Sequence, residues 1–189
     1  MHGPTSIKHL EETTNVREQF FRPMASCLLT AALCLSSTFA TADNLPLPQG
    51  EILLTISGAV EHTNNGETTV FDIEMLQQLG AMEFTTNTIW TEGPQKFTGV
   101  PLKALVAYVD AQGATLRATA INDYAVDIPV DSLADDGPIV AYFLNDVPMS
   151  VREKGPLWVV YPYDSNDDYR NEVIYSRSVW QLDRIVIKD

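Results

Sequence analysis

The strongest constraint on the fold is a series of short apolar runs, rich in β-branched and aromatic residues and separated by turn-forming residues. Runs of this length and composition are typical of β-strands, whereas apolar residues at helical spacing are few. Because no regular helices alternate with these strands, the sequence predicts a mixed, β-rich α+β domain. The expected strands cover residues 52–57, 68–71, 82–90, 115–121, 125–128, 139–144, 157–161 and 184–188.

Helical signals are short and occur at three places. Asp72 is a suitable N-cap for the first of these helices, and Gly80 is a suitable residue to end it. Pro101 fits the first position of the second helix, whose apolar residues recur at helical spacing. The expected helices cover residues 73–79 and 102–109, with a third near Val130 or Asp131.

Two tight turns are predicted between neighbouring strands. Asn65-Gly66 supplies the positive φ angles that a close chain reversal needs, and Asn145-Asp146 is a second turn sequence of this kind. His62 lies beside the first turn, where a histidine is far more often solvated than catalytic. The sequence has no Gly-x-Ser-x-Gly nucleophile motif with which His62 would act, so we predict no catalytic residue.

An apolar run over residues 24–39 is too short to span a bilayer but has the size of the apolar region of a secretion signal. Arg17 and Arg22 precede it, and Ala40-Thr-Ala42 follows as a small-x-small cleavage sequence. We therefore expect a periplasmic protein without stable membrane insertion after cleavage. Its parts would be a signal peptide at 1–42 cleaved after Ala42, a Pro-rich linker at 43–50 and a domain at 51–189.

Cleavage would remove most of the side chains that could bind a metal or form a disulfide. Both cysteines, Cys27 and Cys34, belong to the leader, and His62 would be the only histidine left. The mature chain would then have no thiolate for a soft transition metal and no disulfide. We predict no metal-ligating residue in it.

The segment Asp164-Ser-Asn-Asp-Asp168 places oxygen ligands at alternate positions, like the opening of a calcium loop. Tyr169 stands where the loop needs a glycine, and Tyr175 stands where it needs a bidentate glutamate. The segment is therefore expected to be an acidic turn that caps a short helix.

Acidic side chains outnumber basic ones by 25 to 12, which gives a formal net charge of -13. Proteins bind nucleic acid largely through Lys and Arg side chains that displace counterions from phosphates. Anionic lipid surfaces likewise attract basic clusters. We therefore expect a domain that works in water, with neither nucleic acid nor a lipid surface as its partner.

Aromatic residues are concentrated near the C-terminus, with Arg170 and Arg177 interleaved among them. Such a cluster suits either a site for a planar or anionic ligand or the ordinary core packing of a strand-loop-strand unit, and both interpretations stay open. The aromatic residues of this segment are Trp158, Tyr161, Tyr163, Tyr169, Tyr175 and Trp180.

Four segments, Trp90–Leu102, Ile139–Met149, Lys154–Pro162 and Arg177–Ile185, resemble the blocks of one known family. In the first, Trp90 is followed by an aromatic-x-Gly-Val-x-Leu turn that opens a helix. In this order the four blocks resemble the molybdopterin-binding domain of the sulfite oxidase family. The resemblance implies that family's β-rich α+β fold over residues 51–189, and it implies molybdopterin as the cofactor of an oxidoreductase.

The departures from the family concern the cofactor. A cysteine four residues before the Trp supplies the thiolate that binds molybdenum in the family, and Thr86 stands at that place. A threonine hydroxyl does not replace a soft thiolate ligand. Trp158 and Trp180 stand where the family has an Arg and a Lys, and Arg177 keeps the charge of the first Lys position. The family's pterin-contacting histidine has no counterpart.

The hypothesis that follows is a former cofactor cleft that has lost its metal and binds a different small ligand, a pterin-like molecule or a protein partner. Aromatic side chains replace most of the positive charges that would hold a pterin phosphate. The residues predicted to form the cleft are Thr86, Trp90, Tyr124, Trp158, Tyr161, Arg177 and Trp180.

Two other functions stay open. A molybdopterin-dependent periplasmic oxidoreductase would hold molybdenum through the dithiolene of the cofactor alone. A sensory or accessory module would bind a membrane signalling protein or a redox protein. Neighbouring genes for a histidine kinase or cyclase would favour the sensory module, whereas a gene for a haem-carrying subunit would favour the oxidoreductase.

Overall fold

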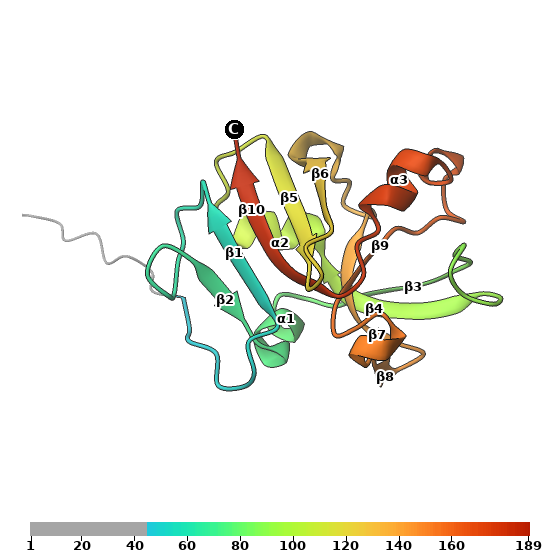
Figure 1. Cartoon of the computed structure of the whole chain (residues 1–189), viewed down its shortest axis with the longest axis horizontal. Coiled ribbons are helices and arrows are strands. Elements are labelled where there is room, and N and C mark those ends of the chain that lie inside the picture. Colours follow the sequence, from blue (N-terminus) through green and yellow to red (C-terminus); the bar gives the residue numbers. More distant parts are fainter. Residues whose placement is uncertain (1–44) are drawn as a thin grey trace, which may run out of the picture. The chain divides into compact units, whose positions relative to one another are not determined.

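The computed structural model describes residues 45–189, and the predicted signal peptide lies outside the described residues. The described chain forms two sheets, the first mixed and the second antiparallel, with short helices between and beside them (Figure 1). The first sheet has the order β2 (Thr69–Phe71), β1 (Leu54–Gly58), β10 (Leu182–Lys188), β5 (Thr115–Ala120) and β6 (Ala125–Pro129). The second contains β3 (Met82–Thr86), β4 (Gln95–Pro101), β7 (Ile139–Leu144), β8 (Val147–Pro148) and β9 (Trp158–Val160).

The first sheet joins the two ends of the described chain. β1 pairs in parallel with β10 and antiparallel with β2, while β5 pairs antiparallel with both β10 and β6. Alternate residues of β1 are buried, including Leu54 and Ile56, as expected for a strand with one face on the core. The last strand of the chain therefore lies between β1 and β5.

The second sheet contains a strand that the sequence did not predict. In β4, Gly99 and Pro101 interrupt the apolar alternation that signals a strand. Its glycine has a packing reason, because a Cβ at Gly99 would collide with the carbonyl oxygen of Val140 in β7. The pairing of β4 with β7 shifts register between Thr98 and Gly99.

The predicted strand over 82–90 is too long. β3 ends at Thr86, and residues 87–94 form a loop. The reason is that the Asn87 backbone N–H donates to the Asp164 carboxylate and the Trp90 N–H donates to Thr88 Oγ1, so neither is free for strand pairing.

The helices follow the sequence in part. Asp72 Oδ1 accepts a hydrogen bond from the Met75 N–H and caps the first helix, as predicted. Pro101 is the last residue of β4 and stands at the N-cap position of the second helix, so its placement as the first helical residue was wrong. At the place of the expected third helix, near Val130 or Asp131, the chain forms a 3₁₀ turn, whereas the helix over Glu172–Arg177 was not predicted. The helices are α1 (Ile73–Gln78), α2 (Leu102–Tyr108) and α3 (Glu172–Arg177), with 3₁₀ turns η1 (Val130–Ser132), η2 (Val151–Glu153) and η3 (Asp167–Tyr169).

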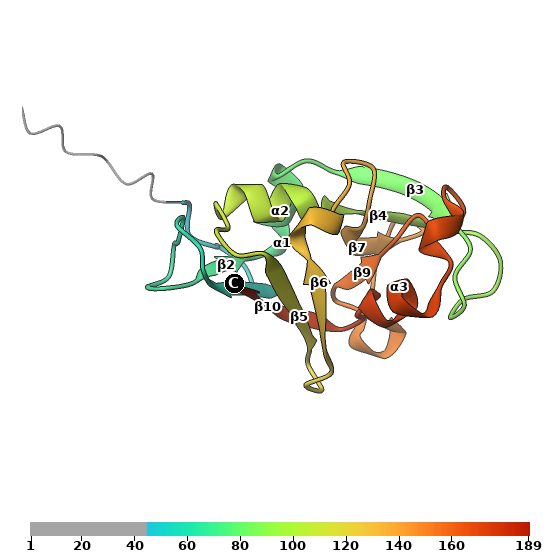
Figure 2. The ribbon, with the colours of Figure 1, turned by 90° about the horizontal axis from the view of Figure 1, so that it is seen from above.

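Figure 2 shows α1 and α2 on one face of the first sheet and α3 beside β9. No helix among residues 45–189 has the length and apolar content that crossing a bilayer requires. The expected acidic turn is present, because the Asn166 side chain caps η3 by accepting the Asp168 N–H at 2.9 Å.

Both predicted turns reverse the chain. Asn145 and Asp146 have φ angles of 51° and 65° and join β7 to β8 in a tight hairpin, which confirms that prediction. At the turn between β1 and β2, Asn65 pairs with Thr68, and of the Asn-Gly pair only Gly66 has a positive φ angle, 63°. The His62 side chain is exposed.

Residues before the first strand lie against the domain. The backbone N–H groups of Gln49 and Gly50 donate to Asp72 Oδ2 at 2.6 and 2.8 Å. Burial raises the pKa of Asp72, but hydrogen bonds from the backbone N–H groups of Met75, Gly50 and Gln49 lower it by more. One buried carboxylate thus holds both this segment and the start of α1.

One continuous core joins the two sheets. Side chains of α2, including Leu102 and Leu105, are fully buried between them. The largest fully buried side chains are Trp158, Tyr161, Tyr163, Phe71 and Phe97. Three of these five lie in or directly after β9, so the aromatic segment near the C-terminus supplies much of the core.

Candidate functional site

The loop between β3 and β4 carries Trp90, which stands at the centre of an aromatic cluster. Thr86 and Asn87 anchor the start of this loop to the segment after β9. The Asp164 N–H donates to Thr86 Oγ1 at 3.0 Å, while the Asn87 N–H donates to Asp164 Oδ2 at 2.7 Å. The backbone N–H of Asn87 is the main cause that lowers the pKa of Asp164. Asp164 therefore remains a carboxylate and fixes the loop on which Trp90 stands.

Four aromatic rings surround Trp90 in edge-to-face arrangements. Its ring centroid lies 5.8 Å from that of Trp158, 6.2 Å from Tyr163, 5.9 Å from Tyr175 and 5.6 Å from Trp180. Interplanar angles of 61° to 85° are those that the ring quadrupoles favour. Trp90 is consequently held on several sides by contacts with elements far apart in the sequence.

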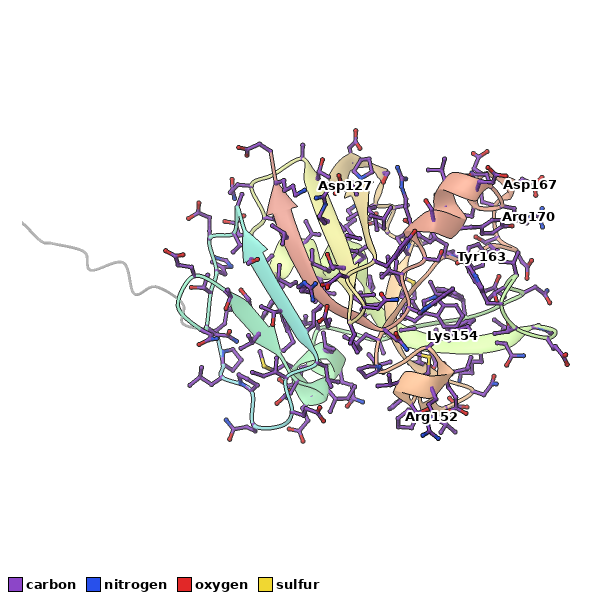
Figure 3. The ribbon with its side chains drawn as sticks, in the orientation of Figure 1. Asp127, Arg152, Lys154, Tyr163, Asp167 and Arg170 are labelled. Carbon is purple, nitrogen blue, oxygen red and sulfur yellow. The ribbon has the colours of Figure 1, made fainter. Side chains whose placement is uncertain are left out.

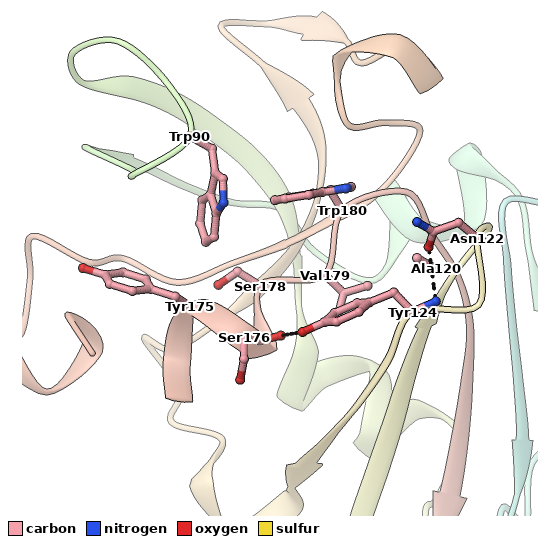
Figure 4. Close-up of a pocket in the computed structure, with 9 residues that line it drawn as sticks. All are labelled: Trp90, Ala120, Asn122, Tyr124, Tyr175, Ser176, Ser178, Val179 and Trp180. Atoms are coloured by element: carbon pink, nitrogen blue, oxygen red, sulfur yellow. Dashed lines mark hydrogen bonds between the residues drawn. The ribbon is translucent and has the colours of Figure 1, made fainter. Parts of the chain in front are cut away.

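A pocket of about 290 Å³ opens beside this cluster (Figure 4). Two of its aromatic side chains are open to solvent, Trp180 at 37% and Tyr124 at 48% of their full exposure. Large aromatic side chains that remain exposed around a concave site are typical of ligand or partner recognition. The lining residues are Trp90, Ala120, Asn122, Tyr124, Tyr175, Ser176, Ser178, Val179 and Trp180.

Hydrogen bonds fix the wall of the pocket that α3 provides. The Tyr124 hydroxyl, from the β5–β6 hairpin, donates to the Ser176 carbonyl oxygen at 2.9 Å. Ser178 Oγ donates to the Ile174 carbonyl oxygen at 2.9 Å, so Tyr163 must supply the proton of its 2.5 Å bond to Ser178. Figure 3 shows Tyr163 on the side of the domain that carries α3. Elements from both sheets thus hold this short helix.

Only some of the predicted site residues line the pocket. Trp90, Tyr124 and Trp180 line the pocket, whereas Trp158 is fully buried beneath it and in ring contact with Trp90 and Trp180. Thr86 is also buried and does not line the pocket, because its hydroxyl oxygen accepts the Asp164 N–H.

Tyr161 and Arg177 lie close to each other but do not line the pocket. The Tyr161 side chain is buried, and its hydroxyl has no hydrogen-bond partner among the described residues. Burial raises the pKa of Tyr161 to about 12, while the positive charge of Arg177 acts in the opposite direction. Arg177 ends α3 and is half-buried.

Six lining residues were absent from the predicted set. Tyr175 had a signal in the sequence, since it belongs to the aromatic-rich segment, whereas the small and polar residues have none. They enter the site through α3 and the residues directly after it, and through the end of β5 and the turn that follows it. These six are Ala120, Asn122, Tyr175, Ser176, Ser178 and Val179.

Comparison with solved structures identifies the fold. The sulfane dehydrogenase SoxCD from Paracoccus pantotrophus is similar to this chain with a TM-score of 0.56 and 22% sequence identity. The similarity covers 77% of this chain. This chain has a sulfite-oxidase-like fold. The match spans 40% of the length of the SoxCD chain. No family model and no curated protein sequence matches the chain.

The donor set does not fit molybdopterin with a protein-bound metal. The described residues contain no cysteine, and Thr86, which the sequence resemblance places at the family's cysteine position, is buried with its hydroxyl oxygen engaged by the Asp164 N–H. No group of three or more His, Cys, Asp or Glu side chains in residues 45–189 is placed to hold a metal ion. The described residues therefore offer this cofactor no thiolate ligand for its metal.

Proposed function

We propose that this domain is a ligand-binding module, whose aromatic pocket binds a small planar organic molecule of the pterin-like class. The observation that carries the proposal is the exposure of the Trp180 and Tyr124 rings around a pocket that Trp90 also lines, with Trp90 held by four edge-to-face contacts. A planar ligand would cover apolar ring surface that otherwise faces water.

The size of the pocket restricts the ligand. A volume of about 290 Å³ lies near the lower end of the range of small-molecule sites, which suits one or two fused rings. Each aromatic ring that packs against such a ligand contributes about 0.5–1.5 kcal/mol beyond the burial of area. Contacts with Trp90 and Trp180 together would therefore add about 1–3 kcal/mol to the binding free energy.

The side-chain amide of Asn122 would give the pocket a preference for ligands with hydrogen-bond acceptors. The Asn122 Oδ1 accepts the Tyr124 N–H at 3.2 Å, and its Nδ2 donates no hydrogen bond to the described residues. Amide donors at the edge of an apolar pocket orient a ligand more than they add affinity. Ring nitrogens and carbonyl oxygens of a pterin-like heterocycle are suitable acceptors.

Calorimetric titration of the chain with pterin and with lumazine tests this function. We expect saturable binding of at least one of them, and Trp180→Ala should weaken it by about tenfold through loss of the largest exposed ring. Ile52→Ala is the control, because Ile52 is 51% exposed and lies outside the pocket. Absence of binding by both compounds, or equal affinity of the Trp180→Ala variant, would contradict the proposal.

We also propose that the module acts in the periplasm after cleavage behind Ala42. The apolar run over 24–39 and the Ala40-Thr-Ala42 sequence support this. Sequencing of the N-terminus of the chain from a periplasmic fraction should give Asp43 as the first residue. A secreted chain that retains Cys34 would contradict the proposed cleavage.

A second candidate is an interaction module for a membrane signalling or redox protein. It is favoured by two exposed apolar residues next to the pocket, Ile121 at 49% and Val173 at 57% exposure. Exposed apolar residues around a pocket are also found where proteins dock. Cross-linking in cells through a photoreactive residue at Val173, compared with one at Ile52, distinguishes a partner from a small ligand.

A further inference from the structure

Two basic side chains near η2 have no carboxylate partner. Most Lys and Arg residues of the described region form ion pairs, as expected in a chain with 25 acidic and 12 basic residues. Arg152 and Lys154 form none with any described residue, although they are two positions apart. Figure 3 shows both side chains beside η2, away from Arg170, which is paired with Asp167.

Arg152 and Lys154 line a second pocket, of about 520 Å³. Leu144, Val147 and Met149 form an apolar wall of this pocket. Trp158 also lines it, and the Lys154 Nζ lies 5.7 Å from the centre of the Trp158 ring. This pocket therefore combines two cations with apolar surface, and Trp180 does not take part in it.

The indole N–H of Trp158 is an unused donor. Trp158 is fully buried, and its Nε1 has no hydrogen-bond partner among the described residues. Since no described group accepts from this N–H, its environment is set by the surrounding side chains, among them Lys154 over the ring. The only carboxylate in the pocket is that of Glu153, whose Oε2 accepts from Ser150 Oγ at 3.0 Å.

The backbone that carries the two cations is fixed. Lys154 has a φ angle of 74°, and its carbonyl oxygen accepts the Gln181 N–H at 2.9 Å. The Gln181 Nε2 donates to the Val151 carbonyl oxygen at 2.8 Å. These bonds tie η2 to the segment before β10, so the positive charges are held near the pocket before any ligand arrives.

We propose that this second pocket binds a small organic oxyanion, a carboxylate or phosphate ester with an apolar group. The oxyanion would lie between Arg152 and Lys154, while its apolar group packs on Val147 and Met149. Because the Lys154 side chain lies over the Trp158 ring, the indole N–H would report the arrival of the anion. Charge-assisted hydrogen bonds to Arg and Lys are among the stronger polar contacts in proteins. This site is additional to the planar-ligand pocket at Trp180.

Indole resonances provide a direct test, because the whole chain has three tryptophans. The ¹⁵N-labelled chain is titrated with hexanoate and with hexyl phosphate, and with hexanol and sodium chloride as controls. We expect at least one of the two anions to shift the Trp158 Nε1–H resonance saturably, with Trp90 and Trp180 almost unchanged. The anion with the higher affinity identifies the head group. Trp→Phe variants assign the three resonances.

The double variant Arg152→Ala/Lys154→Gln should weaken anion binding by about tenfold or more. Lys103→Gln/Lys188→Gln removes the same charge elsewhere and should leave binding unchanged, while Glu153→Gln should strengthen it. Unchanged Trp90 and Trp180 resonances in the free double variant verify its fold. The proposal is overturned if neither anion binds, if hexanol or sodium chloride gives the same shift, if Trp180 shifts in place of Trp158, or if the double variant binds as well as the parent.

Discussion

Trp158 and Trp180 are neighbours with opposite environments. They face each other across a β-bridge with ring centroids 6.5 Å apart, yet Trp158 is fully buried and Trp180 is 37% exposed. Both stand where the resemblance to the sulfite oxidase family places a basic residue. Trp158 therefore belongs to the core, whereas Trp180 leaves part of its ring open to water beside the pocket. We call Trp158, Tyr161 and Tyr163 the buried side, and Trp180 and Tyr124 the exposed side, of one aromatic cluster.

The largest difference between the two sides should appear in stability. Trp158→Ala removes a fully buried ring that contacts Phe97, Trp90 and Trp180, and a cavity of this kind costs about 3–5 kcal/mol. Trp180→Ala should cost less than half as much, because part of the ring is already in water. Urea denaturation of both variants measures the two values. Equal losses would mean that Trp180 belongs to the core and would remove the distinction between the sides.

The next effect concerns Asp164, which holds the loop that carries Trp90 between the two sides. Asp164→Asn weakens the charge-assisted bonds from Asn87 and should cost about 1 kcal/mol at pH 7 after allowance for solvent screening. Because the pKa of Asp164 in the folded chain is lowered from 3.8, its stabilisation is complete above that pH and is lost as the pH falls through the folded pKa.

The free energy of unfolding at pH 7 and at pH 3, for the parent chain and for Asp164→Asn, checks this prediction. The difference between the two chains should shrink at pH 3. Asp131→Asn is the control, since that side chain is on the surface at η1 and forms no ion pair among the described residues. A pH-independent difference would show that the carboxylate charge does not hold the loop.

On the buried side, Tyr161 and Tyr163 can be compared directly, because both are buried but only the Tyr163 hydroxyl has a hydrogen-bond partner among the described residues. Tyr163→Phe removes the hydroxyl that donates to Ser178 and should cost about 1 kcal/mol, whereas Tyr161→Phe removes a hydroxyl without a partner and should be neutral or stabilising. Thermal unfolding of the two variants compares them directly. A loss for Tyr161→Phe as large as that for Tyr163→Phe would indicate that the Tyr161 hydroxyl has a partner, with Arg177 the nearest candidate.

More of the fold than of the pocket could be predicted from the sequence. Alternating β-branched residues and the Asn145-Asp146 turn depend on local geometry, so the sequence alone predicts them. β4 was missed because Gly99 is required by the approach of Val140, a contact between residues far apart in the chain. Local pattern carries no information about such a contact.

Tertiary packing decides which aromatic side chains are buried in the core and which remain exposed at the pocket. Trp158 and Trp180 have the same residue type and lie in the same aromatic-rich segment. Trp158, however, is the first residue of β9 and pairs with Ala141 of β7, whereas Trp180 lies outside a named strand. Asn122 and Ser176 entered the pocket from a hairpin tip and an unpredicted helix. Neither residue type marks a ligand site in a sequence.

The smallest effect is expected at Tyr124, on the exposed side. Tyr124→Phe removes the hydroxyl that donates to the Ser176 carbonyl oxygen but leaves a half-exposed ring in place, so global stability should change by less than about 0.5 kcal/mol. Amide hydrogen exchange in α3 should nevertheless become faster, because this bond joins the β5–β6 hairpin to the helix. If exchange in α3 is unchanged while that of the hairpin increases, the hairpin rather than the helix is the movable wall of the pocket, and ligand entry would take place beside Asn122.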